Sequence, residues 1–223
     1  MGVATSKSTG ARGEKRRTEI LKTALALFNA RGTAEVSTNH IAADLGISVG
    51  NLYWHFSDKE AIVRALYEEH VGRFDEMWQP PTSADDVART LVDALRRTFT
   101  ISWECRFFYR GPGSLTRADP ALRKLYAVQR DRRRGDLHKF QKSLAQLGLL
   151  RLPDGEASLA QLEDLIWMIC VFWLPHVELR DGVLTKQGAL TGARAVLGLY
   201  LPYATKEFSR ALLLALEQAD EET

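Results

Sequence analysis

The stretch from Ser37 to Glu60 most constrains the fold of this chain of 223 residues. Its residues follow the pattern of a helix, a tight turn, a second helix and the start of a third. Ser37 or Thr38 can cap the first helix, because a hydroxyl oxygen accepts a bond from an N–H group that the helix leaves unpaired. Gly46 stands where a left-handed residue is needed to reverse the chain. Two short helices joined in this way have the layout of a helix-turn-helix, whose second helix enters the DNA major groove.

The second half of the stretch continues the pattern. Ser48 can cap the second helix, in which Leu52 and Phe56 fall on the inward face. Ser57 and Glu60 have the spacing of a capping box, which predicts the start of a third helix directly after the second. The segment therefore has a start signal for each of the three helices, and Gly46 marks the end of the first.

This segment resembles the DNA-binding part of the TetR family of transcriptional regulators. The resemblance is carried by Thr38, Ile41-Ala42, Leu45-Gly46-Ile47-Ser48, Gly50, Leu52-Tyr53-Trp54-His55-Phe56 and Lys59-Glu60. It extends to the preceding helix, from about Glu14 to Gly32, so it covers roughly the first third of the chain. It implies a DNA-binding regulator, most often a repressor, and the rest of the chain must be interpreted by itself.

The candidate DNA contacts have two origins. Residues at the start of a recognition helix reach base edges, and here these are Ser48, Val49, Gly50 and Asn51. The resemblance implies contacts with the DNA backbone from Thr38, Tyr53, His55 and Lys59, and Asn39 and Trp54 complete the set. The alternative for Tyr53 and His55 is a half-buried aromatic pair at the edge of the module. Trp54 has a similar structural alternative.

Three parts are expected along the chain. Residues 1–13 are rich in Ser, Thr, Gly and Ala and are predicted to be a disordered arm. Residues 14–60 form the DNA-binding domain, and residues 61–223 form a larger helical domain. Lys15, Arg16 and Arg17 are interpreted either as a solvated helix start or as a basic arm that contacts phosphates.

Helical periodicity continues to the C-terminus, without sustained strand alternation, so the predicted fold is all-α. Proline, glycine and capping residues give the boundaries. Helices are expected at about 58–78, 84–110, 119–147 and 159–178, and from Thr185 to Gln218 with an interruption at Pro202. Gly111-Pro112-Gly113 is interpreted as a turn.

Composition and motifs exclude several classes of protein. The formal charge of +2 does not fit a protein that coats nucleic acid by bulk charge. Cys105 and Cys170 lie too far apart for a zinc motif, and catalytic and phosphate-loop patterns are missing, so we expect no metal, no cofactor and no enzyme activity. An enzyme with an appended DNA-binding module is the rejected alternative. Residues 1–13 lack the apolar core of a signal peptide, and the apolar run 165–175 is too short to cross a bilayer, so a cytoplasmic location is expected.

The resemblance also implies assembly. A two-fold DNA operator requires a two-fold protein, so a homodimer is expected. The resemblance places the dimer interface on the last two long segments, about 159–179 and 185–218. There, close helix approach is expected at a set of small residues: Gly188, Gly192 and Gly198, with Ala189, Ala193 and Ala195. A charge at Gly192 or Val196 is then expected to split the dimer.

The central helices are rich in aromatic residues, which is typical of small-molecule pockets. The candidate ligand contacts are Trp103, Arg106, Phe107, Tyr126, Trp167, Cys170, Trp173 and His176. They predict a largely apolar, aromatic effector, although each of these side chains has the alternative of simply filling the core. A DNA-binding regulator without any small-molecule ligand remains the alternative for the whole chain. The sequence identifies neither the operator nor the effector.

Overall fold

The computed structural model describes residues 4–75 and 77–221, with side chains from Arg12 onward. All regular elements of this described part are helical, which confirms the all-α prediction. The chain forms two compact units, residues 1–70 and 71–223. The division falls later than the predicted boundary after Glu60.

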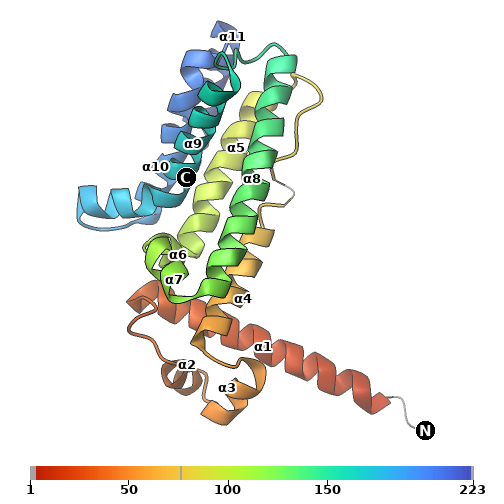
Figure 1. The fold of residues 1–223 in the computed structure, drawn as a ribbon, viewed down its shortest axis with the longest axis vertical. Coiled ribbons are helices and arrows are strands. Elements are labelled where there is room, and N and C mark those ends of the chain that lie inside the picture. The colour runs from red at the N-terminus through yellow and green to blue at the C-terminus, as the bar shows by residue number, and fades with distance from the viewer. Residues whose placement is uncertain (1–3, 76, 222–223) are drawn as a thin grey trace. The chain divides into compact units, whose positions relative to one another are not determined.

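The first unit consists of the helices that contain and precede the helix-turn-helix stretch (Figure 1). They are α1 (Ala4–Arg31), α2 (Thr38–Asp44), α3 (Val49–His55) and α4 (Lys59–Gly72), whose last turn passes the division between the units. Each helix contributes to one small core, made of Ile20, Ala24, Phe28, Ile41, Leu52, Phe56, Ile62 and Leu66. This core fixes the angle between α2 and α3.

The N-terminus differs from the sequence prediction. Residues 1–13 were expected to be disordered, but α1 begins at Ala4, so residues 4–13 are helical; residues 1–3 lie outside the described part. The segment contains no proline, and extending an existing helix costs much less than nucleating one. Its turn-favouring composition is therefore compatible with extension of the helix that follows.

The local capping signals are mostly confirmed. Ser37 and Ser48 accept the backbone N–H groups of His40 and Asn51, and Gly46 has the expected positive φ of 66°. The predicted Ser57 cap is wrong, because the carboxylate of Asp58 accepts the N–H of Ala61 at 2.6 Å.

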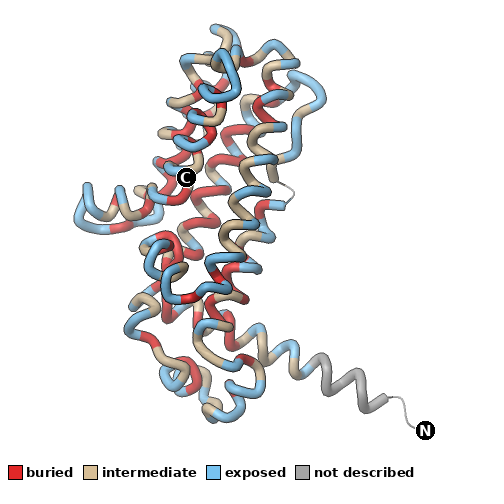
Figure 2. Tube along the Cα trace, in the orientation of Figure 1, coloured by how far each residue is buried: buried red, intermediate tan, exposed pale blue. Residues whose placement is uncertain are grey.

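The second unit is a bundle of longer helices with short connecting ones (Figure 1). Its elements are α5 (Val87–Glu104), α6 (Arg106–Tyr109), α7 (Pro112–Ala118), α8 (Pro120–Gln146), α9 (Glu156–Asp181), α10 (Lys186–Tyr200), a 3-10 turn η1 (Leu201–Tyr203) and α11 (Lys206–Glu221). Helix α5 lies at the centre, since α10 and α11 both pack on it. Buried residues line the facing sides of these helices (Figure 2).

Two helices are shorter than predicted. Helix α4 ends at Gly72 instead of about Trp78, and the chain continues in turns, with Asp75 bonded to the carbonyl of Gly72. Helix α5 ends at Glu104 instead of Arg110, because the backbone leaves the helical region at Cys105 (φ −111°, ψ 33°). The predicted turn at Gly111-Pro112-Gly113 is the start of α7, where proline suits the first helical position.

Helix α9 is three residues longer at each end than the predicted 159–178, since it runs from Glu156 to Asp181 with Pro175 inside it. With 26 residues and a mean hydropathy of 1.4 in its most apolar window, it is long and apolar enough to cross a membrane by length and composition. One such helix is weak evidence for a membrane span, since core helices of soluble proteins have the same properties.

The glycines of α10 pack inside the subunit, which corrects the predicted dimer contacts. A Cβ atom on Gly192 would lie 2.2 Å from the Phe99 ring of α5, and Val196 is fully buried in the same core. A charge at either position would therefore disrupt the subunit itself. Gly198 differs, because nothing lies within 4 Å of the place where its Cβ would be.

Candidate DNA-binding and effector sites

The first candidate site is the outer face of α3 together with the start of α2. Leu52 anchors α3 in the core with no exposed surface, whereas Tyr53 and Trp54 are 49% and 77% exposed. Ser48, Gly50 and Asn51 are exposed and Val49 is half-buried. The first turn of α3 therefore presents its predicted base-contacting residues to solvent.

The predicted backbone-contacting residues lie on the same unit, and two of them touch. The hydroxyl groups of Thr38 and Tyr53 are hydrogen-bonded at 3.1 Å, which joins the start of α2 to α3. Asn39, beside Thr38, is exposed. The Lys59 ammonium donates to the carbonyl of Thr33 at 2.8 Å, so the half-buried lysine is positioned by the loop before α2.

His55 lies between Trp54 and the basic residues of α1. Its ring forms an edge-on pair with Trp54 at 4.7 Å between centroids. Its pKa is lowered, first by burial and then by the positive charges of Arg16 and Arg17, with Glu14 opposing. The Arg17 guanidinium also lies 5.0 Å from the centroid of the Phe56 ring. The basic residues of α1 and the end of α3 thus form one positive neighbourhood.

The second candidate site is the set of predicted ligand contacts in the C-terminal unit, and its known contacts fall into three groups. Trp167 donates to the Tyr126 hydroxyl at 3.3 Å. The Arg106 guanidinium lies 4.4 Å from the centroid of the Trp103 ring. Trp173 and His176 pair at 5.0 Å. The separation of Trp167 from His176 is about two and a half helical turns, which places them on opposite sides of α9.

Phe107, Cys170 and His176 differ in how accessible they are. Phe107 is 5% exposed and belongs to the core. Burial raises the pKa of Cys170 to about 12, so its thiol is almost entirely protonated near neutral pH and unsuited to redox sensing. His176 is exposed. Because Trp167 and His176 lie on opposite sides of α9, the eight predicted residues do not all line one pocket wall.

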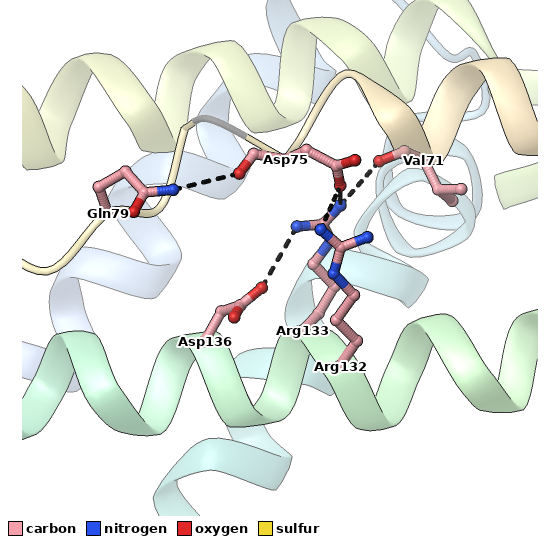
Figure 3. Close-up of polar contacts among 6 residues, drawn as sticks. All are labelled: Val71, Asp75, Gln79, Arg132, Arg133 and Asp136. Atoms are coloured by element: carbon pink, nitrogen blue, oxygen red, sulfur yellow. Dashed lines mark hydrogen bonds and ion pairs between the residues drawn. The ribbon is translucent and has the colours of Figure 1, made fainter.

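Polar residues that the sequence interpretation missed lie on the inward face of α8. Only 11% of the Arg133 side chain is exposed; it donates to the Val71 carbonyl at 2.9 Å, to Asp136 at 3.3 Å and to Asp75 (Figure 3). Gln129 lies one turn before it. A signal was present, because the apolar stripe of this helix has a gap between Tyr126 and Leu137, and Gln129 and Arg133 are the residues that fill that gap.

A second missed group lies where α8 faces α9 and α10. His138 Nδ1 is 2.8 Å from Glu163 Oε1, and Glu163 is only 6% exposed. Gln141, which is fully buried, donates to the Tyr200 hydroxyl at 3.2 Å. This is a polar cluster inside an otherwise apolar bundle. Within the described residues, no group of His, Cys, Asp and Glu has an arrangement that could hold a metal ion.

Comparison with known proteins gives a consistent result along the chain. A family model described as "Bacterial regulatory proteins, tetR family" matches residues 20–66, and one described as "Bacterial transcriptional repressor" matches residues 66–212. The regulator AcrR of Shigella flexneri is 28% identical over 101 residues, which are 43% of this chain and 47% of the relative. The match thus spans about half the length of that curated relative.

Solved structures extend the similarity to the whole fold. A TetR-family regulator from Marinobacter aquaeolei VT8 is 29% identical, with a TM-score of 0.81 over 91% of this chain and 97% of its own. The SmeT–triclosan complex has the same fold, with a TM-score of 0.59 and 15% identity over 86% of this chain and 93% of its own. Because the two family models together match residues 20–212, this chain belongs to the TetR family of bacterial transcriptional regulators, which are DNA-binding proteins and not enzymes.

Proposed function

We propose that this protein is a cytoplasmic, homodimeric repressor that binds a palindromic DNA operator and is released by a small-molecule effector. The observation that carries the proposal is the capped, solvent-facing first turn of α3 on a rigid helix-turn-helix. Residues 14–60 are proposed as the DNA-reading domain and residues 61–223 as the effector and dimerisation domain. The family membership supports both assignments.

The proposed DNA contacts divide by role. Ser48, Val49, Gly50 and Asn51 approach base edges, since the first turn of a recognition helix lies deepest in the groove. The residues proposed to hold the phosphate backbone are Thr38, Asn39, Tyr53, Trp54, His55 and Lys59. Such contacts position the protein without selecting a sequence.

The proposed dimer interface is the outer face of α9. Leu165, Met168, Phe172 and Leu179 are between 38% and 87% exposed, and they recur at the spacing of a heptad seam. An exposed apolar stripe of this length is unfavourable in water unless a partner covers it. A second copy of the chain is the partner proposed, because an operator with two-fold symmetry requires two recognition helices related by the same symmetry.

The effector part of the proposal is supported by the fold neighbour SmeT, whose structure is of a complex with triclosan. A thermal-shift screen tests it, because a ligand that binds only the folded protein raises its melting temperature. If the regulator has no ligand, no compound should both raise its melting temperature and change its operator affinity.

The DNA part is tested by mapping the sites that the protein occupies across its own genome. Enriched fragments are expected to share an inverted repeat whose half-sites lie about one helical turn apart. Binding to the intact repeat should exceed binding to one half-site at equal salt. Equal binding to random DNA of the same length would contradict the proposal.

A further inference from the structure

Helix α8 carries buried polar atoms that no other group in the described residues satisfies. They are Gln129 Oε1, Arg133 Nε and Gln141 Oε1. Buried polar groups in native proteins nearly always have a hydrogen-bond partner, and an exception indicates a ligand or water. Gln141 is the clearest case, since it has no exposed surface and its other amide end is already bonded to Tyr200.

The surroundings of Gln141 are rich in acceptors. Glu163 brings a carboxyl group that is almost fully buried, and its one described partner is His138. Burial raises the pKa of the Tyr200 hydroxyl, the bond from Gln141 opposes this, and Cys170 and Glu163 raise it further. His138 and Gln141 lie three residues apart on the same side of α8, and their contacts with Glu163 and Tyr200 bring the groups of α8, α9 and α10 into one neighbourhood.

Aromatic rings continue from this polar cluster. Trp167 follows Glu163 by one turn of α9, so both lie on the same side of the helix. Its ring lies 6.3 Å from the ring of Tyr126, which lies 6.2 Å from the ring of Phe108. A carboxyl group at one end and aromatic rings at the other match a ligand that carries a cationic nitrogen on an aromatic body.

We propose that this α8–α9 cluster is the effector site and that it selects a protonated nitrogen carried on an aromatic body. The inference rests on the proposed effector response. The ligand nitrogen takes the place of the His138 imidazole at Glu163 Oε1 and donates to Gln141 Oε1, while its aromatic part lies against Trp167 and Tyr126. The His138 side chain is 39% exposed, so the displaced ring can move into solvent.

The charges around the cluster favour a cation over an anion. Arg134, the guanidinium that faces α9 beside Glu163, is already paired with Asp164. Arg133 is paired with Asp75 and Asp136. Glu163 therefore has only His138 as its described partner, and a carboxylate ligand would place two like charges together in a medium of low dielectric constant.

Three matched probes test the inference on the unaltered full-length protein: 2-(2-naphthyl)ethylamine, the corresponding alcohol and 2-naphthylacetic acid. Tryptophan fluorescence and thermal shift report binding. The amine should bind at least about tenfold more tightly than the alcohol, and the acid more weakly still. Equal binding of amine and alcohol, preference for the acid, or no binding of any probe would overturn the inference.

A pair of variants locates the site. Glu163→Gln keeps the size of the side chain and removes its charge, and it should reduce amine affinity about tenfold while alcohol affinity stays unchanged. Asp164→Asn, on the next residue and 62% exposed, is the control and should leave both affinities unchanged. Amine affinity that survives Glu163→Gln would overturn the assignment. If that variant fails to fold, the comparison of the three probes still decides the class of ligand.

Operator binding, measured with and without the amine, separates the two proposals. An amine that binds and lowers operator affinity supports both. An amine that binds through Glu163 and leaves operator affinity unchanged supports the ligand class and contradicts the effector role. Specific operator binding with no affinity for the amine contradicts the ligand class alone.

Discussion

At the scale of single residues, the protonation of His55 offers a test of the proposed DNA interface. Its pKa in the free protein is lowered by burial and by Arg16 and Arg17. Nearby phosphates stabilise the charged imidazolium, so DNA binding should raise this pKa and take up a proton. Operator affinity should therefore increase as the pH falls from 8 towards the pKa in the complex, and then further towards the pKa of the free protein.

The measurement is the operator dissociation constant across this pH range at fixed salt. His55→Gln is the control, since it keeps a polar side chain but cannot titrate, and it should flatten the pH profile. The stability of the free protein should respond in the opposite direction. A histidine whose folded-state pKa is lowered contributes stability that is present above its unfolded-state pKa and lost as the pH falls below it. A pH profile unchanged by His55→Gln would remove His55 from the phosphate contacts.

Two glycines of α10 test the corrected packing of that helix. Gly192→Ala would bring a methyl group to 2.2 Å from the Phe99 ring, so the core must shift, at a cost of about 1–3 kcal/mol. Gly198→Ala meets nothing within 4 Å and should stabilise the helix by up to about 1 kcal/mol. Urea denaturation of both variants measures the difference. A neutral Gly192→Ala would show that α10 does not pack this closely on α5.

At the scale of elements, α8 is tied to the turn after α4 by Arg133. This side chain is mostly buried and donates to the Val71 carbonyl and to Asp75 (Figure 3). Arg133→Met keeps much of the apolar stem but leaves these acceptors unpaired, which should cost about 1–3 kcal/mol of unfolding free energy. Arg132→Met is the control, since its guanidinium also pairs with Asp75 but is 49% exposed, and its loss should cost less than about 1 kcal/mol.

Chemical denaturation of the two variants decides whether burial makes the contacts of Arg133 contribute more to the free energy of unfolding than those of Arg132. Equal effects would show that the pair is an ordinary surface contact. A larger effect of Arg133→Met would identify this residue as the link between the end of α4 and the bundle of the second unit. In that case, effector affinity should be measured in the same variant, because α8 also carries the polar cluster.

The elements also show what could be predicted from sequence. Caps at Ser48, Asp119 and Thr185 were predictable, because the donor and acceptor lie within three residues of each other. The polar interior of α8 depends on partners far along the chain, such as Asp75 for Arg133. The small residues of α10 predicted close helix packing correctly, but composition does not say whether the neighbour is α5 or a second subunit.

The candidate DNA site is easier to derive from the sequence than the candidate effector site, for a similar reason. The helix-turn-helix is a short, contiguous motif, so sequence spacing alone determines which residues of α3 face outward. The candidate effector contacts come from four helices, α5, α6, α8 and α9, and their grouping depends on how these helices are rotated. Helical spacing alone separates Trp167 from His176, whereas the contact of Glu163 with His138 depends on how α8 and α9 face each other.

At the scale of the whole molecule, the exposed stripe of α9 predicts that folding and association are coupled. Only folded subunits associate, so association stabilises the folded state. The melting temperature should therefore rise with protein concentration. Phe172→Glu places a charge in the middle of the stripe and should remove this dependence, while operator affinity falls sharply. Val128→Glu, at an exposed apolar position of α8, is the matched control and should retain both properties.

Light scattering gives the mass of each variant, and circular dichroism shows whether each remains helical. A folded, monomeric Phe172→Glu protein that binds a single half-site weakly is the expected result, because each subunit keeps its own recognition helix but loses the two-fold arrangement that the operator requires. If Phe172→Glu remains a dimer with concentration-dependent melting, the second copy must bind through another surface. The exposed Leu213 and Leu214 of α11 would then be the next residues to substitute.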